Sequence, residues 1–128
     1  MKKNKIFQVN SDERGSILDI VSKEEYDALT MIISKKNAIR GNHYHKHTIQ
    51  TVYIHSGKLR SLTRLPGENI KSTNLNPGDI LTTIEYEHHA LIALEDSTFF
   101  VLTRGPRSGM DYETDTFRLE KPLQDEIE

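Results

Sequence analysis

The chain has 128 residues, a length that suits one core, and we expect a single domain over 1–128 with its core at about 11–119. There is no cysteine, so disulfides and thiolate-bound metals are excluded, and any metal must have nitrogen and oxygen ligands. The formal net charge is -2, without a basic patch for nucleic acid, and no stretch is long enough to span a bilayer. These features predict a cytoplasmic protein whose partner is a small molecule, with no nucleic acid and no membrane.

Short apolar runs separated by polar turns make up the first part of the chain. Ile6–Val9 is typical of an edge strand or arm, and Ser16–Val21 is typical of a short β-branched strand that follows the turn at Gly15. Leu29–Ser34 is a fuller apolar run and predicts a buried strand, which a polar turn at 35–37 closes.

Two histidines separated by one residue mark the next segment. On a β-strand, His43 and His45 project from the same face roughly 6.5 to 7 Å apart, a spacing that suits one small site. Gln50 then begins a second apolar run, which closes at Gly57. The pattern predicts a hairpin in which a histidine strand and a glutamine strand face each other.

The later segments continue the β pattern. Asn76–Asp79 predicts a tight turn, because proline presets one turn angle and Gly78 accepts positive φ. From Met110 onward the pattern stops being β-like, and we expect Glu120–Glu128 to be frayed. With turns about every eight to twelve residues and no convincing long helix, the chain predicts an antiparallel barrel or jelly roll. The other expected strands are Leu59–Leu65, Ile70–Leu75, Ile80–Ile84, His89–Leu94 and Thr98–Thr103.

The order of His43, His45, Gln50 and Gly57 resembles the first motif of the cupins, small jelly-roll barrels, in which glutamate stands at the position of Gln50. Asn76–Asp79 followed by Ile84 and His89 resembles the second motif. Glu85, Tyr86 and Glu87 replace its proline-any-glycine, and the asparagine after the histidine is missing. The resemblance implies an all-β double-stranded β-helix.

Three patches resemble the cupins of sugar-nucleotide metabolism, the dTDP-4-keto-6-deoxyglucose 3,4-ketoisomerases and their WxcM-like relatives. They are Asp12–Ser16, Arg40–Lys46 with Gln50, and Asp111–Phe117. That family is similar in carrying glutamine at the position of Gln50, and its histidine pair transfers protons without a metal. This chain departs from it by having no tryptophan and by its pair His88–His89.

The resemblance implies that a ketone is moved along the sugar of a dTDP-deoxysugar in surface polysaccharide biosynthesis. His43 and His45 suit proton transfer because an unperturbed histidine has a pKa near 6.5, and Arg40 suits stabilisation of an enediolate or phosphate. In this reading Gln50, Tyr86 and His89 are substrate-binding residues, and no cofactor is required. We expect an isomerase or epimerase.

Other readings stay open at this point. His43, His45 and His89 are typical ligands of a divalent transition metal such as Zn, Fe, Ni or Mn, with Gln50 as a fourth, weaker ligand because its amide is neutral. A binding or sensing module without catalysis is a third class, since one fold hosts many functions. A plainer interpretation is that His43 and His45 are structural residues of the barrel and that Arg40 is a surface arginine.

The residues around these candidates have simpler expectations. His47 and His55 are expected to be solvated, and Tyr44 is expected to point away from the histidine pair. The acidic segment Asp111–Asp115 is expected to cap the barrel or contact a partner subunit. The resemblance to small cupins further implies a homodimer.

Overall fold

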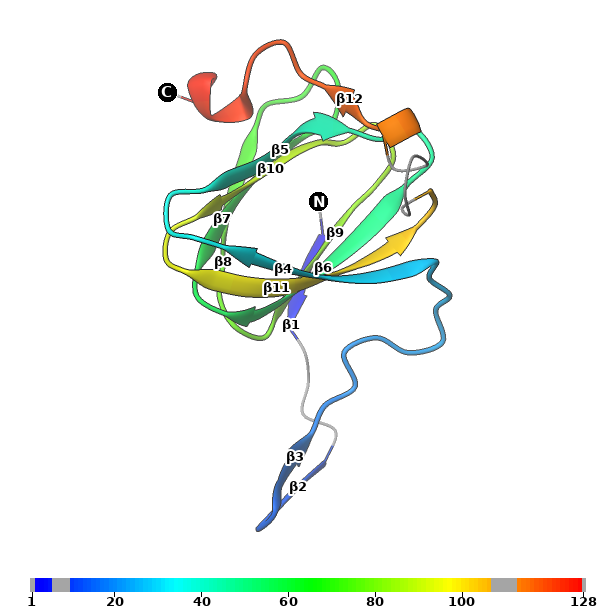
Figure 1. Ribbon diagram of the computed structural model, residues 1–128, viewed down its shortest axis with the longest axis vertical. Coiled ribbons are helices and arrows are strands. Elements are labelled where there is room, and N and C mark those ends of the chain that lie inside the picture. Colours follow the sequence, from blue (N-terminus) through cyan, green and yellow to red (C-terminus); the bar gives the residue numbers. More distant parts are fainter. Residues whose placement is uncertain (1, 6–9, 107–112, 128) are drawn as a thin grey trace.

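Two five-stranded antiparallel sheets face each other in the computed structural model, which describes residues 2–5, 10–106 and 113–127 (Figure 1). The first sheet has the strand order β1 (Lys2–Lys5), β9 (Asp79–Thr83), β6 (Ile49–Ser56), β11 (Ser97–Arg104) and β4 (Ala28–Ser34). The second has the order β12 (Phe117–Arg118), β5 (Ile39–Tyr44), β10 (His88–Ala93), β7 (Leu59–Arg64) and β8 (Lys71–Leu75). Within the described residues, no helix is long and apolar enough to cross a membrane.

From β4 to β12 each strand lies in the other sheet from the strand before it, except that β7 and β8 form a hairpin in one sheet, and this order makes the molecule a jelly-roll barrel. The all-β double-stranded β-helix expected from the sequence is confirmed. The predicted histidine hairpin is wrong: β5 pairs with β10 and β12, whereas β6 pairs with β9 and β11. The turn at 45–48 therefore carries the chain from one sheet to the other, and the two strands face each other across the barrel instead of sharing hydrogen bonds.

The core lies between the sheets and consists of two apolar clusters. The larger cluster uses alternate residues of the strands, as the pleat requires: Val52, Ile54, Leu59, Leu75, Leu81, Ala93, Phe99 and Val101. The smaller cluster contains Leu62, Ala90 and Leu123. Leu123 lies in a short 3-10 helix, η1 (Leu123–Asp125), and is fully buried.

The burial of Leu123 corrects the expectation that the C-terminal residues are frayed. Asn42 holds this segment to the barrel. Its backbone carbonyl accepts from the Leu119 amide at 2.9 Å, and its Oδ1 accepts from the Leu123 amide at 2.8 Å. Its Nδ2 also donates to Gln124 Oε1 at 3.0 Å. Leu123 and Asn42 thus help to fix a segment whose sequence shows no periodicity, together with an ion pair of 2.7 Å between Arg64 and Glu126.

Strand β4 is not buried, as Leu29–Ser34 was expected to be, but lies at the edge of its sheet. Its outward row, Leu29, Met31 and Ile33, is 67%, 57% and 63% exposed, while Ile32 packs against the core. A continuous apolar run matches both a buried strand and an edge strand with an uncovered outer face, so the sequence alone does not separate the two.

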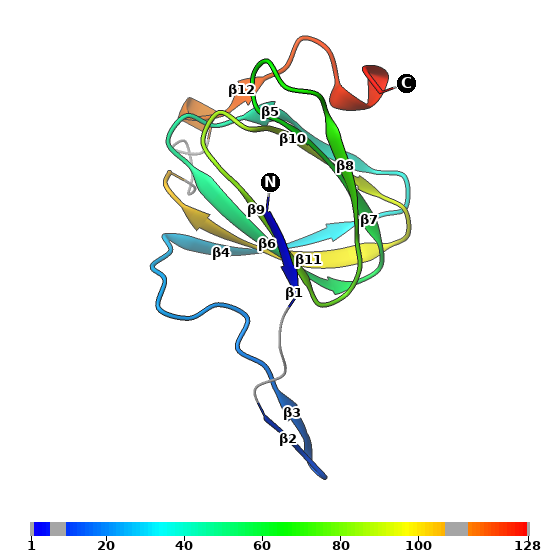
Figure 2. The ribbon, with the colours of Figure 1, turned by 180° about the vertical axis from the view of Figure 1, so that it is seen from behind.

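A hairpin of β2 (Asn10–Asp12) and β3 (Gly15–Ile17) extends away from the barrel as an arm, as both views show (Figures 1 and 2). The strand expected over Ser16–Val21 ends at Ile17, and the predicted strand Ile6–Val9 lies outside the described residues. The arm and the segment after it expose three apolar side chains, Ile17, Leu18 and Val21. A two-stranded hairpin without a core has little stability of its own.

Candidate functional site

A cavity of about 420 Å³ opens between the two sheets, within the size range of small-molecule sites. Both sheets contribute to its wall, and the polar residues among them are Arg40, His43, Gln50, Ser61, Thr83, His89 and Arg118. Within the described part of the chain, the fully charged side chains on this wall are two arginines and no carboxylates. The cavity therefore favours an anionic ligand.

His43 and His89 form the polar centre of the wall. They are direct partners in the ladder of β5 and β10, and their ring centroids lie 4.7 Å apart at 87°. Gly41 makes this approach possible, because it has φ +96° and a Cβ there would lie 2.7 Å from the carbonyl oxygen of His89. The register of β10 shifts between His89 and Ala90, beside this glycine. A glycine and a β-bulge thus aim two imidazoles from neighbouring strands at one space.

His45 belongs to the same cluster but does not line the cavity. It lies just past the end of β5, is 2% exposed, and its ring centroid is 4.8 Å from that of His43 and 5.2 Å from that of His89. One potential ligand atom from each of the three rings lies within 4.8 Å of the others. The structure therefore brings together the three histidines singled out in the sequence, with His43 and His89 in front and His45 behind.

Burial keeps the front histidines neutral. Burial first, and then the neighbouring His89, His45 and Arg118, lowers the pKa of His43 to about 3. Burial likewise lowers the pKa of His89 to about 4, although its hydrogen bond to the Glu87 carbonyl acts in the opposite direction. At neutral pH both rings therefore offer a lone pair, which suits a proton acceptor or a metal ligand.

Asp115 orders the turn that carries His45. The Asp115 carboxylate accepts hydrogen bonds from the backbone amides of Lys46 and His47, each at 3.0 Å, and from the Thr48 hydroxyl at 2.6 Å. Its own backbone carbonyl accepts from His45 Nδ1 at 2.8 Å. Burial pushes the pKa of this carboxyl up, but the hydrogen bonds outweigh that effect and leave the pKa below its ordinary value.

The sequence pointed to an acidic segment around Asp115 but not to this role. Asp115 lies 67 residues from Thr48 in the chain, and a side-chain contact at such a separation leaves no local pattern. An expectation that the segment caps the barrel agrees with the position of Asp115, while Asp111 lies outside the described residues.

Arg40 and Arg118 stand on the cavity wall from adjacent strands, β5 and β12. Arg40 donates to Ser34 Oγ at 2.7 Å and to the Ile33 carbonyl at 3.1 Å, so its guanidinium is tied to β4. Arg118 is paired with His43 in the strand register and is 69% exposed. Sequence reasoning missed Arg118, because only the pairing of β12 with β5 brings it next to the histidines.

The remaining candidates divide between the cavity and the outer surface. Gln50 lines the cavity from β6, as expected. Tyr86 does not reach it: this side chain is 49% exposed and stacks with Tyr44, at 6.4 Å between ring centroids. His47 and His55 are exposed, which confirms that expectation.

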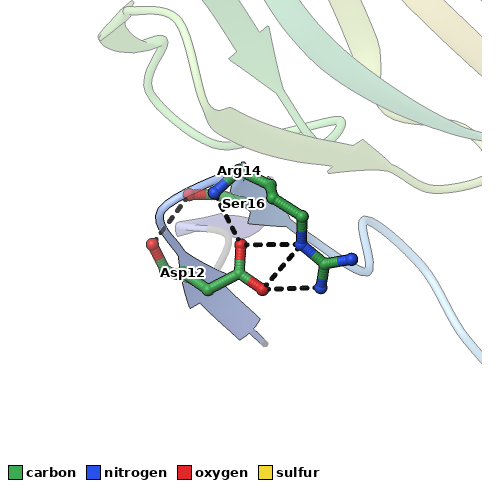
Figure 3. Close-up of polar contacts among 4 residues, drawn as sticks. Asp12, Arg14 and Ser16 are labelled. Carbon is green, nitrogen blue, oxygen red and sulfur yellow. Dashed lines mark hydrogen bonds and ion pairs between the residues drawn. The ribbon is translucent and has the colours of Figure 1, made fainter.

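The polar patch Asp12–Ser16 of the arm is held together by contacts within the arm itself. Figure 3 shows the Asp12 carboxylate facing the Arg14 guanidinium, with an ion pair of 2.7 Å. The Asp12 carboxylate also accepts from the backbone amide of Arg14 at 2.9 Å. The hydrogen bonds from Arg14 lower the pKa of Asp12. Within the described residues, none of the patch Asp12–Ser16 lines the histidine cavity.

The fold and the histidine-lined cavity define a small barrel of the cupin class. The chain belongs to the family described as the polysaccharide biosynthesis C-terminal domain, whose model matches residues 10–103. No curated protein sequence matches it.

Several solved structures are similar to this chain. A 3,4-ketoisomerase from Helicobacter canadensis is 22% identical, with a TM-score of 0.78, and the match covers 98% of this chain and 92% of that one. The 3,4-ketoisomerase QdtA from Thermoanaerobacterium thermosaccharolyticum, a double mutant in complex with TDP, is 24% identical, with a TM-score of 0.76 and coverage of 92% and 86%. The rmlC epimerase of Mycobacterium tuberculosis is 15% identical, with a TM-score of 0.76 and coverage of 91% and 67%. At these identities the likeness concerns the fold.

Proposed function

We propose that this chain, acting as a single domain, is an isomerase or epimerase that moves a proton next to the keto group of a dTDP-deoxysugar in surface polysaccharide biosynthesis. The observation that carries the proposal is the pairing of His43 with His89 on the wall of a cavity whose fully charged groups are arginines. The family match to polysaccharide biosynthesis and the complex of QdtA with TDP support it.

The side chains that line the cavity suit proton transfer next to a ketone. A neutral His43 or His89 takes the proton from the carbon next to the ketone and becomes an imidazolium, while the ketone becomes an enediolate. In an isomerisation the imidazolium returns this proton to the former carbonyl carbon, and the hydroxyl proton of the first carbon passes to the former carbonyl oxygen. In an epimerisation a proton returns to the first carbon from the opposite face. A base with a depressed pKa gains basicity when an anion forms beside it, because the enediolate stabilises the imidazolium. Arg40 and Arg118 are placed to bind the phosphates or the enediolate oxygen.

The three histidines have different tasks in this proposal. His43 and His89 face the cavity and act on the substrate, while His45 supports them from behind. This proposal assigns proton transfer to His43 and His89 on two strands, where the sequence analysis assigned it to His43 and His45. Gln50, on the opposite sheet, is placed to donate a hydrogen bond to a sugar hydroxyl or carbonyl.

Thermal unfolding with TDP and with TDP-4-keto-6-deoxyglucose tests the proposal. A ligand at 100 times its Kd that binds only the folded state adds about 2.7 kcal/mol to the free energy of unfolding. We expect a clear rise in Tm with either ligand, and a smaller rise for Arg118→Gln. Arg60→Gln is the control, because Arg60 is exposed and does not line the cavity. No shift at millimolar TDP in the parent protein would contradict the proposal.

A second candidate function is metal binding by His43, His45 and His89, with Gln50 as a fourth ligand. It is favoured by the convergence of three ligand atoms within 4.8 Å of one another. Two nitrogens bound to one zinc at about 2.1 Å in a tetrahedron lie about 3.4 Å apart, so binding requires a modest contraction of the cluster. Elemental analysis of the purified chain tests this candidate. Stoichiometric metal that disappears in His45→Ala would support it, and metal-free protein stabilised by TDP would favour the isomerase.

We further propose that the protein is a homodimer in which a second copy covers the outer face of β4 and the arm. The exposed row Leu29, Met31 and Ile33 is an apolar surface that none of the described residues covers, and Ile17 on the arm is 61% exposed. Each copy thus supplies both an uncovered face and an arm without a core. Light scattering after size exclusion should give twice 14.7 kDa, and Met31→Glu should give a monomer, whereas the control Ile127→Glu should not.

A further inference from the structure

Asp115 and Glu87 each place a backbone carbonyl against the Nδ1 atom of one histidine. The backbone carbonyl of Asp115 lies 2.8 Å from His45 Nδ1, and that of Glu87 lies 3.0 Å from His89 Nδ1. Both acidic side chains are almost fully buried, at 3% and 2% exposed. Neither lines the cavity, so their burial requires a reason other than contact with a ligand.

The carboxylates provide that reason, because each one anchors the loop that presents its histidine. Asp115 accepts from two backbone amides and a hydroxyl of the turn at 46–48. Glu87 Oε1 accepts from the backbone amide of Ile84 at 3.1 Å and so closes the turn that precedes β10. A buried carboxylate that accepts several hydrogen bonds holds the surrounding backbone in place. In Asp115 and Glu87 this backbone includes the residue's own carbonyl group, which faces a histidine Nδ1.

A carbonyl oxygen can only accept a hydrogen bond, and this fixes the proton on each ring. Nδ1 of His45 and of His89 must carry the hydrogen, so in the neutral ring the lone pair lies on Nε2. In metal-binding histidines, too, a hydrogen bond from the ring nitrogen that does not bind the metal sets the tautomer and the ring orientation. His89 Nε2 is buried without a hydrogen-bond partner among the described residues, as expected for an atom kept for a ligand.

We propose that Asp115 and Glu87 are positioning residues that fix His45 and His89 as Nδ1–H tautomers and so keep each Nε2 as an acceptor. Only the task of these Nε2 atoms rests on the proposed function. Proton acceptance and metal binding both need a lone pair on Nε2. The tautomers themselves can be measured without a substrate.

Long-range ¹H–¹⁵N spectra of ¹⁵N-histidine-labelled protein at pH 7.5 test the proposal. In the parent protein, His45 and His89 should each show a protonated Nδ1 and an unprotonated Nε2. Asp115→Ala should convert His45 to a mixture of tautomers and leave His89 unchanged, because the turn at 46–48 loses its anchor. Glu87→Ala should convert His89 to a mixture of tautomers and leave His45 unchanged. Asp115→Asn keeps one acceptor oxygen, so it should give a smaller fraction of the Nε2–H tautomer at His45 than Asp115→Ala.

Asp79→Ala is the matched control. Asp79 is also buried, at 2% exposed, and accepts from the Asn76 amide at 2.8 Å, but the turn it closes carries no histidine. It should lower Tm as Asp115→Ala does and leave both tautomers unchanged. If Asp115→Ala does not fold, the parent spectrum and Asp115→Asn decide the question.

An Nε2–H tautomer at His45 or His89 in the parent protein would overturn the proposal, as would folded Asp115 variants with an unchanged His45. If the predicted tautomers are found and the protein neither binds nor converts a nucleotide sugar, the positioning role stands and the proposed function fails. The two failures are therefore distinguishable.

Discussion

His43 on β5 and His89 on β10 are direct partners in an antiparallel ladder, with ring centroids 4.7 Å apart, although 46 positions separate them in the sequence. Their rings share one cavity wall because Gly41 lets the two strands approach closely beside a register shift. The proposed proton transfer depends on this pair of rings.

Removing either front imidazole should abolish most of the proposed turnover. General acid–base catalysis contributes about 10²- to 10⁴-fold, so His43→Asn and His89→Asn should each lower kcat by a factor in that range. His55→Asn is the control, because His55 is exposed on the outer side of β6. Full turnover in both cavity variants, with the same substrate, would show that neither ring transfers the proton.

Acid should destabilise the fold well above the range in which carboxylates titrate. The pKa of His43 is about 3 and that of His89 about 4 in the folded chain, against 6.5 in the unfolded chain. Between these values the unfolded chain binds protons that the folded chain does not, so the free energy of unfolding decreases as pH falls below 6.5. The slope approaches about 1.4 kcal/mol per pH unit for each histidine.

Urea unfolding at several pH values between 7.5 and 4.5 measures this effect. The parent midpoint should fall steadily below pH 6.5, and the double variant His43→Gln/His89→Gln should show a flatter profile. Carboxylates with lowered pKa values, such as Asp115, contribute only at pH values near and below 4. A parent midpoint that does not change between pH 6.5 and 4.5 would contradict neutral, buried histidines.

Gly41→Ala should cost more than an ordinary substitution at a left-handed glycine. Its Cβ would lie 2.7 Å from the His89 carbonyl oxygen and 3.1 Å from Ala90 Cα, in addition to the strain of φ +96°. Gly67→Ala is the matched control, since Gly67 has φ +85° and nothing within 4 Å of the added Cβ. The control should lose about 1 to 3 kcal/mol, and Gly41→Ala more. Equal losses in urea unfolding would argue against close packing at Gly41.

Leu123→Ala should show that the C-terminal segment is part of the core. Leu123 is fully buried in the smaller apolar cluster, so its truncation should lower the free energy of unfolding by about 2 to 5 kcal/mol. Ile127, which is 43% exposed, provides the control Ile127→Ala with an expected change below about 0.5 kcal/mol. Urea unfolding of both variants measures the difference, and similar small losses would mean that the segment is frayed after all.

The strands were predictable from the sequence because alternation and turn residues act locally. The turn Asn76–Asp79 forms as expected, with the Asp79 amide donating to the Asn76 carbonyl at 3.0 Å. The pairing of strands was harder to predict from the sequence. A histidine strand, a short turn and a glutamine strand can form a hairpin, but they can equally cross from one sheet to the other. Only the closure of the whole barrel decides between the two.

The site, too, has residues that the sequence predicts and residues that it does not. His43, His89 and Gln50 were found from motif spacing and do line the cavity. Arg118 and the contacts of Asp115 were missed, because both depend on the C-terminal segment lying beside β5 and the turn after it. These contacts span about seventy positions and leave no sequence period. Tyr86 was expected at the substrate, but its side chain is exposed, stacks with Tyr44 and does not line the cavity.

Hydrogen exchange between solvent and a keto sugar tests most directly whether the His43–His89 pair transfers a proton. The protein is incubated in D₂O with TDP-4-keto-6-deoxyglucose, the ligand with which a QdtA mutant was crystallised, and deuterium at the ring carbons is followed by NMR. A proton-shuttling His43–His89 pair predicts enzyme-dependent deuterium at the carbon next to the ketone, lost in His43→Asn. No exchange above the protein-free rate at a saturating concentration of the sugar would contradict the claim.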